Sequence, residues 1–146
     1  MLKLNENYIS LHQHTIGSLR DGIMSVSDHV EYAIKNNKKF VAITDHGSIS
    51  EWIELYNQCN KNKLKPIYGV EGYVHLEREK YINEKEGKPD HIVLLALNEK
   101  GFKNIIKIHN DSWVHFYKKP IMSYELIKEL NDGIVVTSGC LGGTIP

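Results

Sequence analysis

The sequence has no excess of either charge and no long hydrophobic run, and each absence removes a class of protein. Lysine plus arginine and aspartate plus glutamate both number 18, so no overall charge attracts the chain to nucleic acid or to an anionic membrane. No stretch approaches the roughly 18 apolar residues of a membrane span, and the first residues form no apolar signal segment. We therefore expect a cytoplasmic protein with no membrane partner.

Cysteine is also scarce. Cys59 and Cys140 are the two cysteines of the 146 residues; they are too few and too far apart for a disulfide framework, and they form no CxxC pair. The length suits one modest domain with a buried core. Nothing in the sequence suggests a P-loop, a dinucleotide fingerprint or a serine nucleophile elbow.

What the sequence does have is histidine at the ends of apolar runs. His12 and His14 follow the run 8–11, and the run 40–43 leads into a second group that contains His46. Side chains two apart in a strand share a face, so His12 and His14 can form a bidentate metal clamp, unless one is packed and the other solvated. Parallel α/β folds place their chemistry at such strand ends, which predicts a metal site.

Apolar runs alternate with helical periodicities along the chain, which predicts an α/β fold. The alternation favours mostly parallel strands joined by right-handed crossovers, in an open sheet or part of a barrel, and the apolar run 91–97 is typical of a strand buried on both faces of a parallel sheet. We expect residues 77–90 to form a charged surface loop. The predicted strands are 8–12, 40–44, 67–76, 91–97 and 134–137; the predicted helices start at Ser27, at Ser48 or Ser50, near Lys100 and at Ser123.

Four further residues are candidates for the site, each with a plain alternative. Glu71 lies in an apolar strand between glycines, where burial would require a partner or a metal, although it could also be exposed on an edge strand. Asp21 and Asp45 could bind a metal or orient an imidazole, or could cap the helices that follow them. Cys140 could be a thiolate ligand or a small buried cysteine.

The remaining histidines and one aromatic segment are interpreted as ordinary. His29, His75, His109 and His115 lie within predicted helices or beside charged loops. The aromatic and basic stretch from Trp113 to Pro120 could contact nucleic acid by stacking and phosphate pairing. Core packing followed by a solvated turn is the favoured interpretation.

Taken together, the candidates form a mixed nitrogen and oxygen ligand set at strand ends. Such a set suits Zn, Mn or Fe, and it can activate water for hydrolysis. Two metals can also stabilise the attacking and leaving oxygens of a phosphoester.

An ordered set of motifs resembles the polymerase and histidinol phosphatase (PHP) family, most closely the N-terminal PHP domain of the bacterial DNA polymerase III alpha subunit. The motifs are His12-x-His14 with Ser-Leu-Arg-Asp-Gly at 18–22, Thr-Asp-His-Gly at 44–47, Lys-Pro-Ile-Tyr-Gly-Val-Glu at 65–71, His-Ile-Val-Leu-Leu-Ala at 91–96, and Ser-Gly-Cys-Leu-Gly-Gly at 138–143. The match covers nearly the whole chain.

The resemblance implies a distorted (β/α)7 barrel with two or three divalent metal ions at its strand ends. It implies catalytic roles for Glu71, as the bridge between metals, and for His14 and His46. His91 fits least well, because the predicted strand starts there and would place it away from the other ligands. The implied metal ligands are His12, His14, Asp21, His46, Glu71, His91 and Cys140.

The sequence departs from the family in what it lacks. The late Asp-x-His pair and the last strands of the barrel are absent, so we expect residues 1–146 to be a PHP domain that stops before the barrel closes. The leading hypothesis is 3′–5′ exonuclease-type phosphoester hydrolysis at a DNA 3′ end, with other polymerase segments in cis or in trans. The alternatives are a non-catalytic scaffold and a stand-alone phosphatase of the histidinol phosphate type.

Overall fold

The computed structural model describes residues 8–19 and 21–139, which form a mixed α/β fold. Across this part of the chain, no helix is both long enough and apolar enough to cross a membrane. The elements are, in order, α1 (Val26–Lys35), β1 (Phe40–Ile43), α2 (Trp52–Lys61), β2 (Lys65–His75), α3 (Arg78–Glu84), β3 (Asp90–Ala96), α4 (Glu99–Val114), β4 (Phe116–Tyr117), β5 (Lys119–Ser123), α5 (Tyr124–Glu129) and β6 (Ile134–Ser138).

The long strand β2 organises a six-stranded mixed sheet. β1 and β5 pair with β2 in parallel, whereas β3 runs antiparallel to β2 and to β6. The expectation that the run 91–97 belongs to a parallel sheet is therefore wrong, because β3 returns alongside β2 in the opposite direction. Over residues 8–19 and 21–139 the strands do not close into a barrel.

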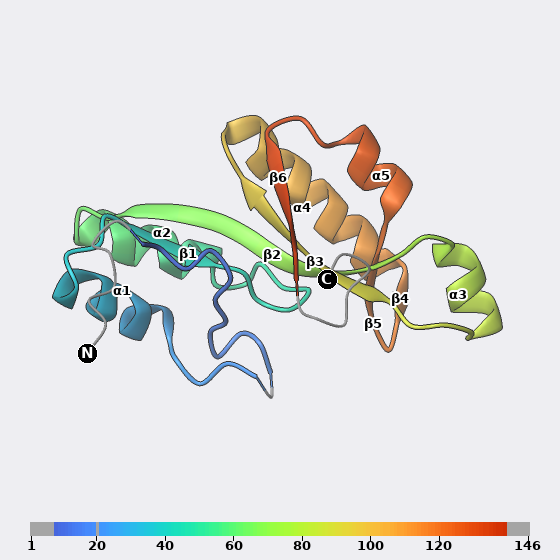
Figure 1. The fold of residues 1–146 in the computed structure, drawn as a ribbon, viewed down its shortest axis with the longest axis horizontal. Helices are drawn as coiled ribbons and strands as arrows, with labels where there is room; N and C mark the ends of the chain where they lie inside the picture. Colours follow the sequence, from blue (N-terminus) through green and yellow to red (C-terminus); the bar gives the residue numbers. More distant parts are fainter. Residues whose placement is uncertain (1–7, 20, 140–146) are drawn as a thin grey trace.

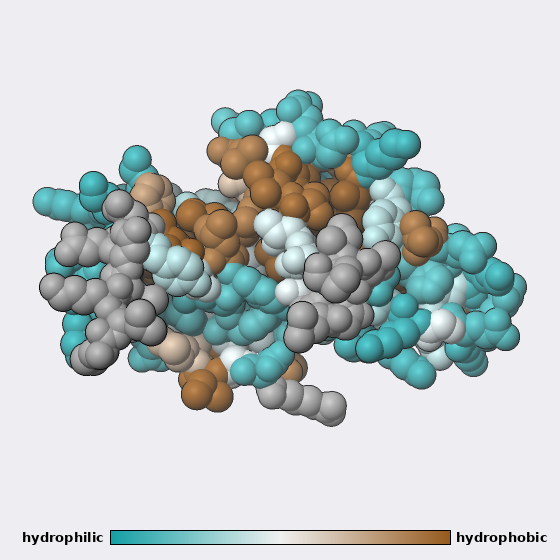
Figure 2. All heavy atoms as spheres, in the orientation of Figure 1, coloured by the Kyte–Doolittle hydropathy of each residue, from teal (hydrophilic) through white to brown (hydrophobic). Residues whose placement is uncertain are grey.

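Among the described residues, the two larger of three apolar cores lie on different parts of β2. Figure 1 shows α1 and α2 near one end of that strand and α4 and α5 toward the other. The first joins α1, α2 and β1 around residues such as Val30, Ile43 and Leu55. The second joins α4 and α5 to the sheet around Leu94, Ile105 and other buried residues. Figure 2 shows hydrophobic residues gathered near β6, while the surface over α3 is hydrophilic. Because β2 belongs to both halves, it fixes their relative position.

The first predicted strand, 8–12, is not a strand. Among the described residues, the backbone groups of its neighbour Gln13 bond to Thr44, just beyond the end of β1. The Thr44 N–H donates to the Gln13 carbonyl, and the Gln13 N–H donates to the Thr44 hydroxyl. One such exchange holds the segment in place, but it forms no ladder of backbone hydrogen bonds.

Residues 77–90 are not a plain surface loop, because they include α3. Among the charged residues of that helix, Tyr81 is buried, and its ring stacks on His75 and meets Tyr117 edge-on. One buried aromatic residue thus anchors the helix. The sequence analysis did not predict the short hairpin of β4 and β5 either. The hairpin turns at Lys118, whose φ is +57°.

The glycines that flank Glu71 are explained by the packing of the sheet. A side chain at Gly69 would come within 2.8 Å of the Leu94 carbonyl oxygen, and one at Gly72 within 2.3 Å of the Met122 sulfur. Neighbouring strands therefore fill the space that a side chain at either position would need.

Of the three helix caps predicted at serine residues, one is confirmed. Ser123 caps α5, as predicted. The cap of α1 is Ser25 rather than Ser27, in a reciprocal capping box with Asp28, and the cap position of α2 is Glu51, without a side-chain bond.

The cap of α1 provides a stability test. We expect Ser25→Ala to lower the free energy of unfolding by about 1 kcal/mol, because it removes a hydrogen bond to a backbone N–H that the helix itself leaves unpaired. Ser27→Ala, two residues along, should change it by less than about 0.5 kcal/mol. Urea unfolding followed by circular dichroism measures both, and equal effects would contradict the assignment of the cap.

Candidate metal centre

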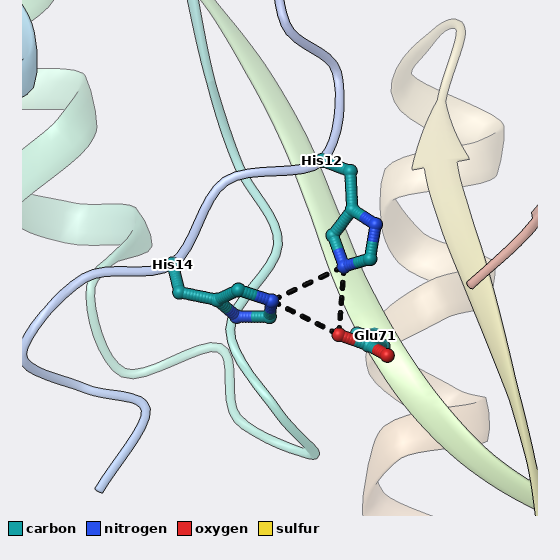
Figure 3. A group of neighbouring side chains, drawn as sticks. All are labelled: His12, His14 and Glu71. Atoms are coloured by element: carbon teal, nitrogen blue, oxygen red, sulfur yellow. Dashed lines mark hydrogen bonds and ion pairs between the residues drawn. The ribbon is translucent and has the colours of Figure 1, made fainter. Parts of the chain in front are cut away.

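A buried carboxylate lies at the centre of the candidate site. Glu71, on β2, is 1% exposed. Its Oε2 lies 2.7 Å from His12 Nε2 and 3.0 Å from His14 Nε2, and its Oε1 lies 2.7 Å from His91 Nδ1. Figure 3 shows the rings of His12 and His14 pointing at this carboxylate from the loop before α1. Both oxygens of Glu71 are therefore engaged by imidazoles.

His12 and His14 share a side, as expected, but without a strand to align them. The residue between them, Gln13, points the other way, and its amide donates to the carbonyls of Ser10 and Ala42. The ring Nε2–H of His29, on α1, donates to the His14 carbonyl at 3.0 Å. These bonds fix the backbone on which the two imidazoles are mounted.

His46 reaches the site through the turn that follows β1. His46 and Glu71 form an isolated parallel bridge, and the Gly47 N–H donates to the Glu71 carbonyl at 2.8 Å. Gly47 has a φ of +56°, a conformation that glycine adopts readily, and the chain turns sharply there. The His46 ring then lies between Glu71 and Asp21: its Nδ1 is 3.3 Å from Glu71 Oε2, and its Nε2 is 2.7 Å from Asp21 Oδ2.

His91 joins the group because of the antiparallel direction of β3. It lies at the start of that strand, opposite Tyr73 of β2 in the register. In a parallel strand this position would lie at the far end of the sheet. The doubt raised by the sequence about His91 came from the wrong strand direction.

Asp45 and Ser18 form a buried network behind the histidines. The Asp45 carboxylate accepts from the Thr15 N–H, the Thr15 hydroxyl and the Ser18 hydroxyl, each at 2.7 Å. Asp45 thus caps no helix. Since the single Ser18 proton points to Asp45, the Ser18 oxygen accepts from the His46 N–H and from His14 Nδ1, both at 3.0 Å.

This network favours the Nδ1–H tautomer of neutral His14. A proton held on Nδ1 leaves the Nε2 lone pair free on the side of Glu71, which is the arrangement a metal ligand needs. Ser18 and Thr15 were missed by the sequence interpretation. Ser18 begins the Ser-Leu-Arg-Asp-Gly motif, but only Asp21 of that motif was considered as a site residue.

The close approach of these groups shifts their pKa values in different directions. Burial is the largest influence on Glu71 and would raise its pKa, but hydrogen bonds from His14, His12 and His91 together lower it to about 2. The hydrogen bond to Glu71 is the largest influence on His14 and raises its pKa above the usual 6.5. For His46, burial dominates and lowers the pKa below 6.5.

The donor set fits divalent metal ions. Three groups of donor atoms lie within 4.8 Å of one another: His12, His14 and Glu71; His14, Asp21 and His46; and His46, Glu71 and His91. In the first group the two Nε2 atoms are 3.1 Å apart, close to the roughly 3.3 Å that separates ligands around tetrahedral zinc. The buried Nδ1 of His46 has no hydrogen-bond partner among the described residues. A metal would use that unsatisfied atom.

Six of the seven predicted ligands therefore meet at one place. Cys140 lies outside the described residues, so its role stays a prediction. Asp21 does not cap α1, and Glu71 is buried rather than exposed on an edge. The histidines read as ordinary, His29, His75, His109 and His115, belong to none of the three donor groups.

Comparison with known proteins agrees with this geometry. The family model described as "PHP domain" matches residues 10–146. The chain belongs to the PHP domain family. It is 35% identical to the DNA polymerase III subunit alpha of Borreliella burgdorferi and 33% identical to that of Thermus aquaticus, covering 99% and 95% of this chain. The matches cover 13% and 12% of those two relatives, so the chain spans about an eighth of their length.

A solved structure shows a more distant likeness. It is an amidohydrolase from Chromobacterium violaceum, with a TM-score of 0.48 and 22% sequence identity. The match covers 70% of this chain and 34% of that one.

The opposite pKa shifts of two neighbouring histidines can be measured in the metal-free chain. NMR titration should find that His14 loses its proton above pH 6.5 and His46 below it. Protonated His14 then adds stability that is fully present below pH 6.5 and is lost as the pH rises through its folded pKa. Glu71→Gln should lower the His14 pKa, because the carboxylate is the main cause of its rise. The reverse order of the two histidines would contradict this account.

Proposed function

We propose that this chain binds two or three divalent metal ions, Zn, Mn or Fe, and hydrolyses phosphoesters at the candidate metal centre. The observation that carries the proposal is the buried Glu71 carboxylate, whose Oε2 faces His12 and His14 and whose Oε1 faces His91. A carboxylate in this position is suited to bridging two ions. The proposed ligands are His12, His14, Asp21, His46, Glu71 and His91, with Cys140 added by the family resemblance.

Bound metals would supply the Lewis acidity that activates water and neutralises charge on a phosphoryl group. The residues of the chain do the rest. Glu71, His14 and His46 are the proposed catalytic residues, since each belongs to two of the three donor groups and so lies where the groups join. Ser18 and Asp45 are positioning residues that keep His14 in the ligand tautomer. Asp21, the most exposed of the ligands at 59%, forms the open side from which a substrate can approach.

The similarity to polymerase alpha subunits supports a place in DNA replication. We propose that the substrate is a DNA 3′ end, that the chemistry is of the 3′–5′ exonuclease type, and that other polymerase segments act with this chain in cis or in trans. A cytoplasmic location follows from that role. A stand-alone phosphatase acting on a small phosphomonoester is the weaker alternative, because the relatives with 30–35% identity over nearly the whole chain include polymerase subunits.

Metal analysis and hydrolysis assays test the proposal together. The 146-residue chain, loaded with Mn or Zn, should bind metal stoichiometrically and release nucleotides from the 3′ end of single-stranded DNA. Glu71→Gln should reduce hydrolysis by at least about 100-fold, because it removes a charged bridging ligand. His75→Gln changes a histidine outside the donor groups and should leave metal content and rate unchanged.

The outcomes separate the alternatives. Hydrolysis of a small phosphomonoester but not of DNA would favour the phosphatase. Bound metal without any hydrolysis would favour the scaffold. A chain that binds no metal would overturn the proposal.

The Ser18 network makes a second prediction about metal binding. Ser18→Ala should weaken metal affinity by roughly 10- to 100-fold, because His14 loses the acceptor that fixes its tautomer and ring orientation. Ser10→Ala removes a hydroxyl bonded only to the His12 carbonyl and serves as the control. Isothermal titration with Zn measures both, and nitrogen chemical shifts should show His14 losing its preference for the Nδ1–H form in the Ser18 variant. Unchanged affinity would show that the loop backbone alone positions the ring.

A further inference from the structure

Two aromatic rings at the end of α4 are exposed although they are held in fixed positions. Trp113 and Phe116 are 50% and 51% exposed, and their rings stack with centroids 5.6 Å apart and planes inclined by 25°. The expectation that this stretch packs into the core is therefore wrong for both residues. Their faces form an apolar platform open to solvent.

The platform is attached to the metal centre through Trp113. The indole N–H lies 2.9 Å from the Gly47 carbonyl and 2.9 Å from His109 Nε2. Gly47 directly follows the candidate ligand His46. The indole is thus oriented at the edge of the metal centre, and its polar atom is satisfied while its ring face stays free.

The hairpin of β4 and β5, which carries Phe116, also carries two lysines. The Lys119 ammonium lies 4.0 Å from the centre of the Tyr73 ring, and that ring is stacked on His46 at 5.7 Å. Lys119 is therefore one aromatic ring away from the metal centre. Lys118, at the turn of the hairpin, lies over Tyr117. Both lysines are exposed.

The neighbouring carboxylate does not cancel this charge. Asp111, two residues before Trp113 on α4, is paired with Arg78 of α3 and lies 3.3 Å from His115 Nδ1. The ammonium groups of Lys118 and Lys119 each lie over a ring rather than against an acid. They are thus free to pair with a mobile anion, and the positive charge is local although the whole chain is neutral.

We propose that Trp113, Phe116, Lys118 and Lys119, here called the aromatic–lysine surface, bind single-stranded nucleic acid and lead its end to the metal centre. Bases stack on the two exposed rings, and the lysines pair with the phosphates between them. A duplex keeps its base faces covered, so the surface selects single strands. The direction toward the metal centre rests on the proposed function, whereas binding itself does not.

Binding is tested with metal removed, so that the result does not depend on hydrolysis. Fluorescence anisotropy of a labelled oligothymidylate, with EDTA present, should show binding to the 146-residue chain. Phe116→Ala should weaken it roughly 5- to 150-fold, the range for loss of one stacked base, and Phe116→Tyr should restore it. Tyr56→Ala removes an equally exposed aromatic residue on α2, 55% exposed, and should have no effect.

Salt dependence tests the lysines separately. Two lysine–phosphate contacts predict a slope of about −1.4 for the logarithm of affinity against the logarithm of salt concentration. Lys119→Gln should reduce the slope by about 0.7, whereas Lys61→Gln, on α2, should leave it unchanged. Trp113 fluorescence gives an independent readout, because the other tryptophan, Trp52, is 5% exposed and a stacked base should quench mainly Trp113.

Hydrolysis then distinguishes failure of this surface from failure of the proposed function. With Mn, Phe116→Ala should raise KM for the oligonucleotide and leave hydrolysis of bis(p-nitrophenyl) phosphate unchanged, since that ester is too small to span the platform. Strand binding that needs Phe116 but occurs without any hydrolysis would support the surface and overturn the proposed activity. Equal binding of duplex, or wild-type affinity in Phe116→Ala and Lys119→Gln, would overturn the surface while leaving the metal centre in place.

Discussion

The structure depends on one buried carboxylate that must have partners. Glu71 lies on the strand that joins both halves of the molecule, and it is 1% exposed. An unpaired carboxylate in such a place is strongly unfavourable. Four imidazoles, which arrive from the loop before α1, the turn after β1 and the start of β3, remove that penalty. Each of these segments is held next to β2, so the fold and the candidate site are one arrangement.

Local patterns predicted most of the helices and strands, because burial and capping act within a few residues. The apolar run before Thr44 and the helix capped by Ser123 are examples. Strand direction was a different matter. A continuous apolar run shows that a strand is buried on both faces but says nothing about its orientation, so β3 was wrongly taken as parallel. His91 was expected to lie away from the other ligands for the same reason, because it starts β3.

The candidate site was predicted better than the reasons for it. His12 and His14 do face one carboxylate, but Gln13 and Thr44 hold them there, instead of the alternation of a strand. Residues that act at a distance were harder to find. The Ser18 hydroxyl connects His14 to Asp45, which is 27 residues away from Ser18 in the sequence. No local sequence pattern predicts such a hydrogen bond. The exposure of Trp113, in the last turn of α4, was not predicted because large aromatic side chains usually bury most of their surface.

The bonds that position the imidazoles are mostly distinct from the atoms that would bind metal. Gln13 and His29 hold backbone carbonyls, and Ser18 holds the Nδ1 of His14, while the Nε2 atoms of His12 and His14 converge on Glu71. At the proposed metal centre, a bound ion would therefore replace protons and hydrogen bonds among the ligands without disturbing the bonds that position them. In a scaffold that needs no metal, apolar side chains of similar volume would often give equal or greater stability than such a buried charged group. The burial of the Glu71 carboxylate, next to an unsatisfied His46 nitrogen, is better explained by the charge of the proposed metal ion than by a contribution to folding.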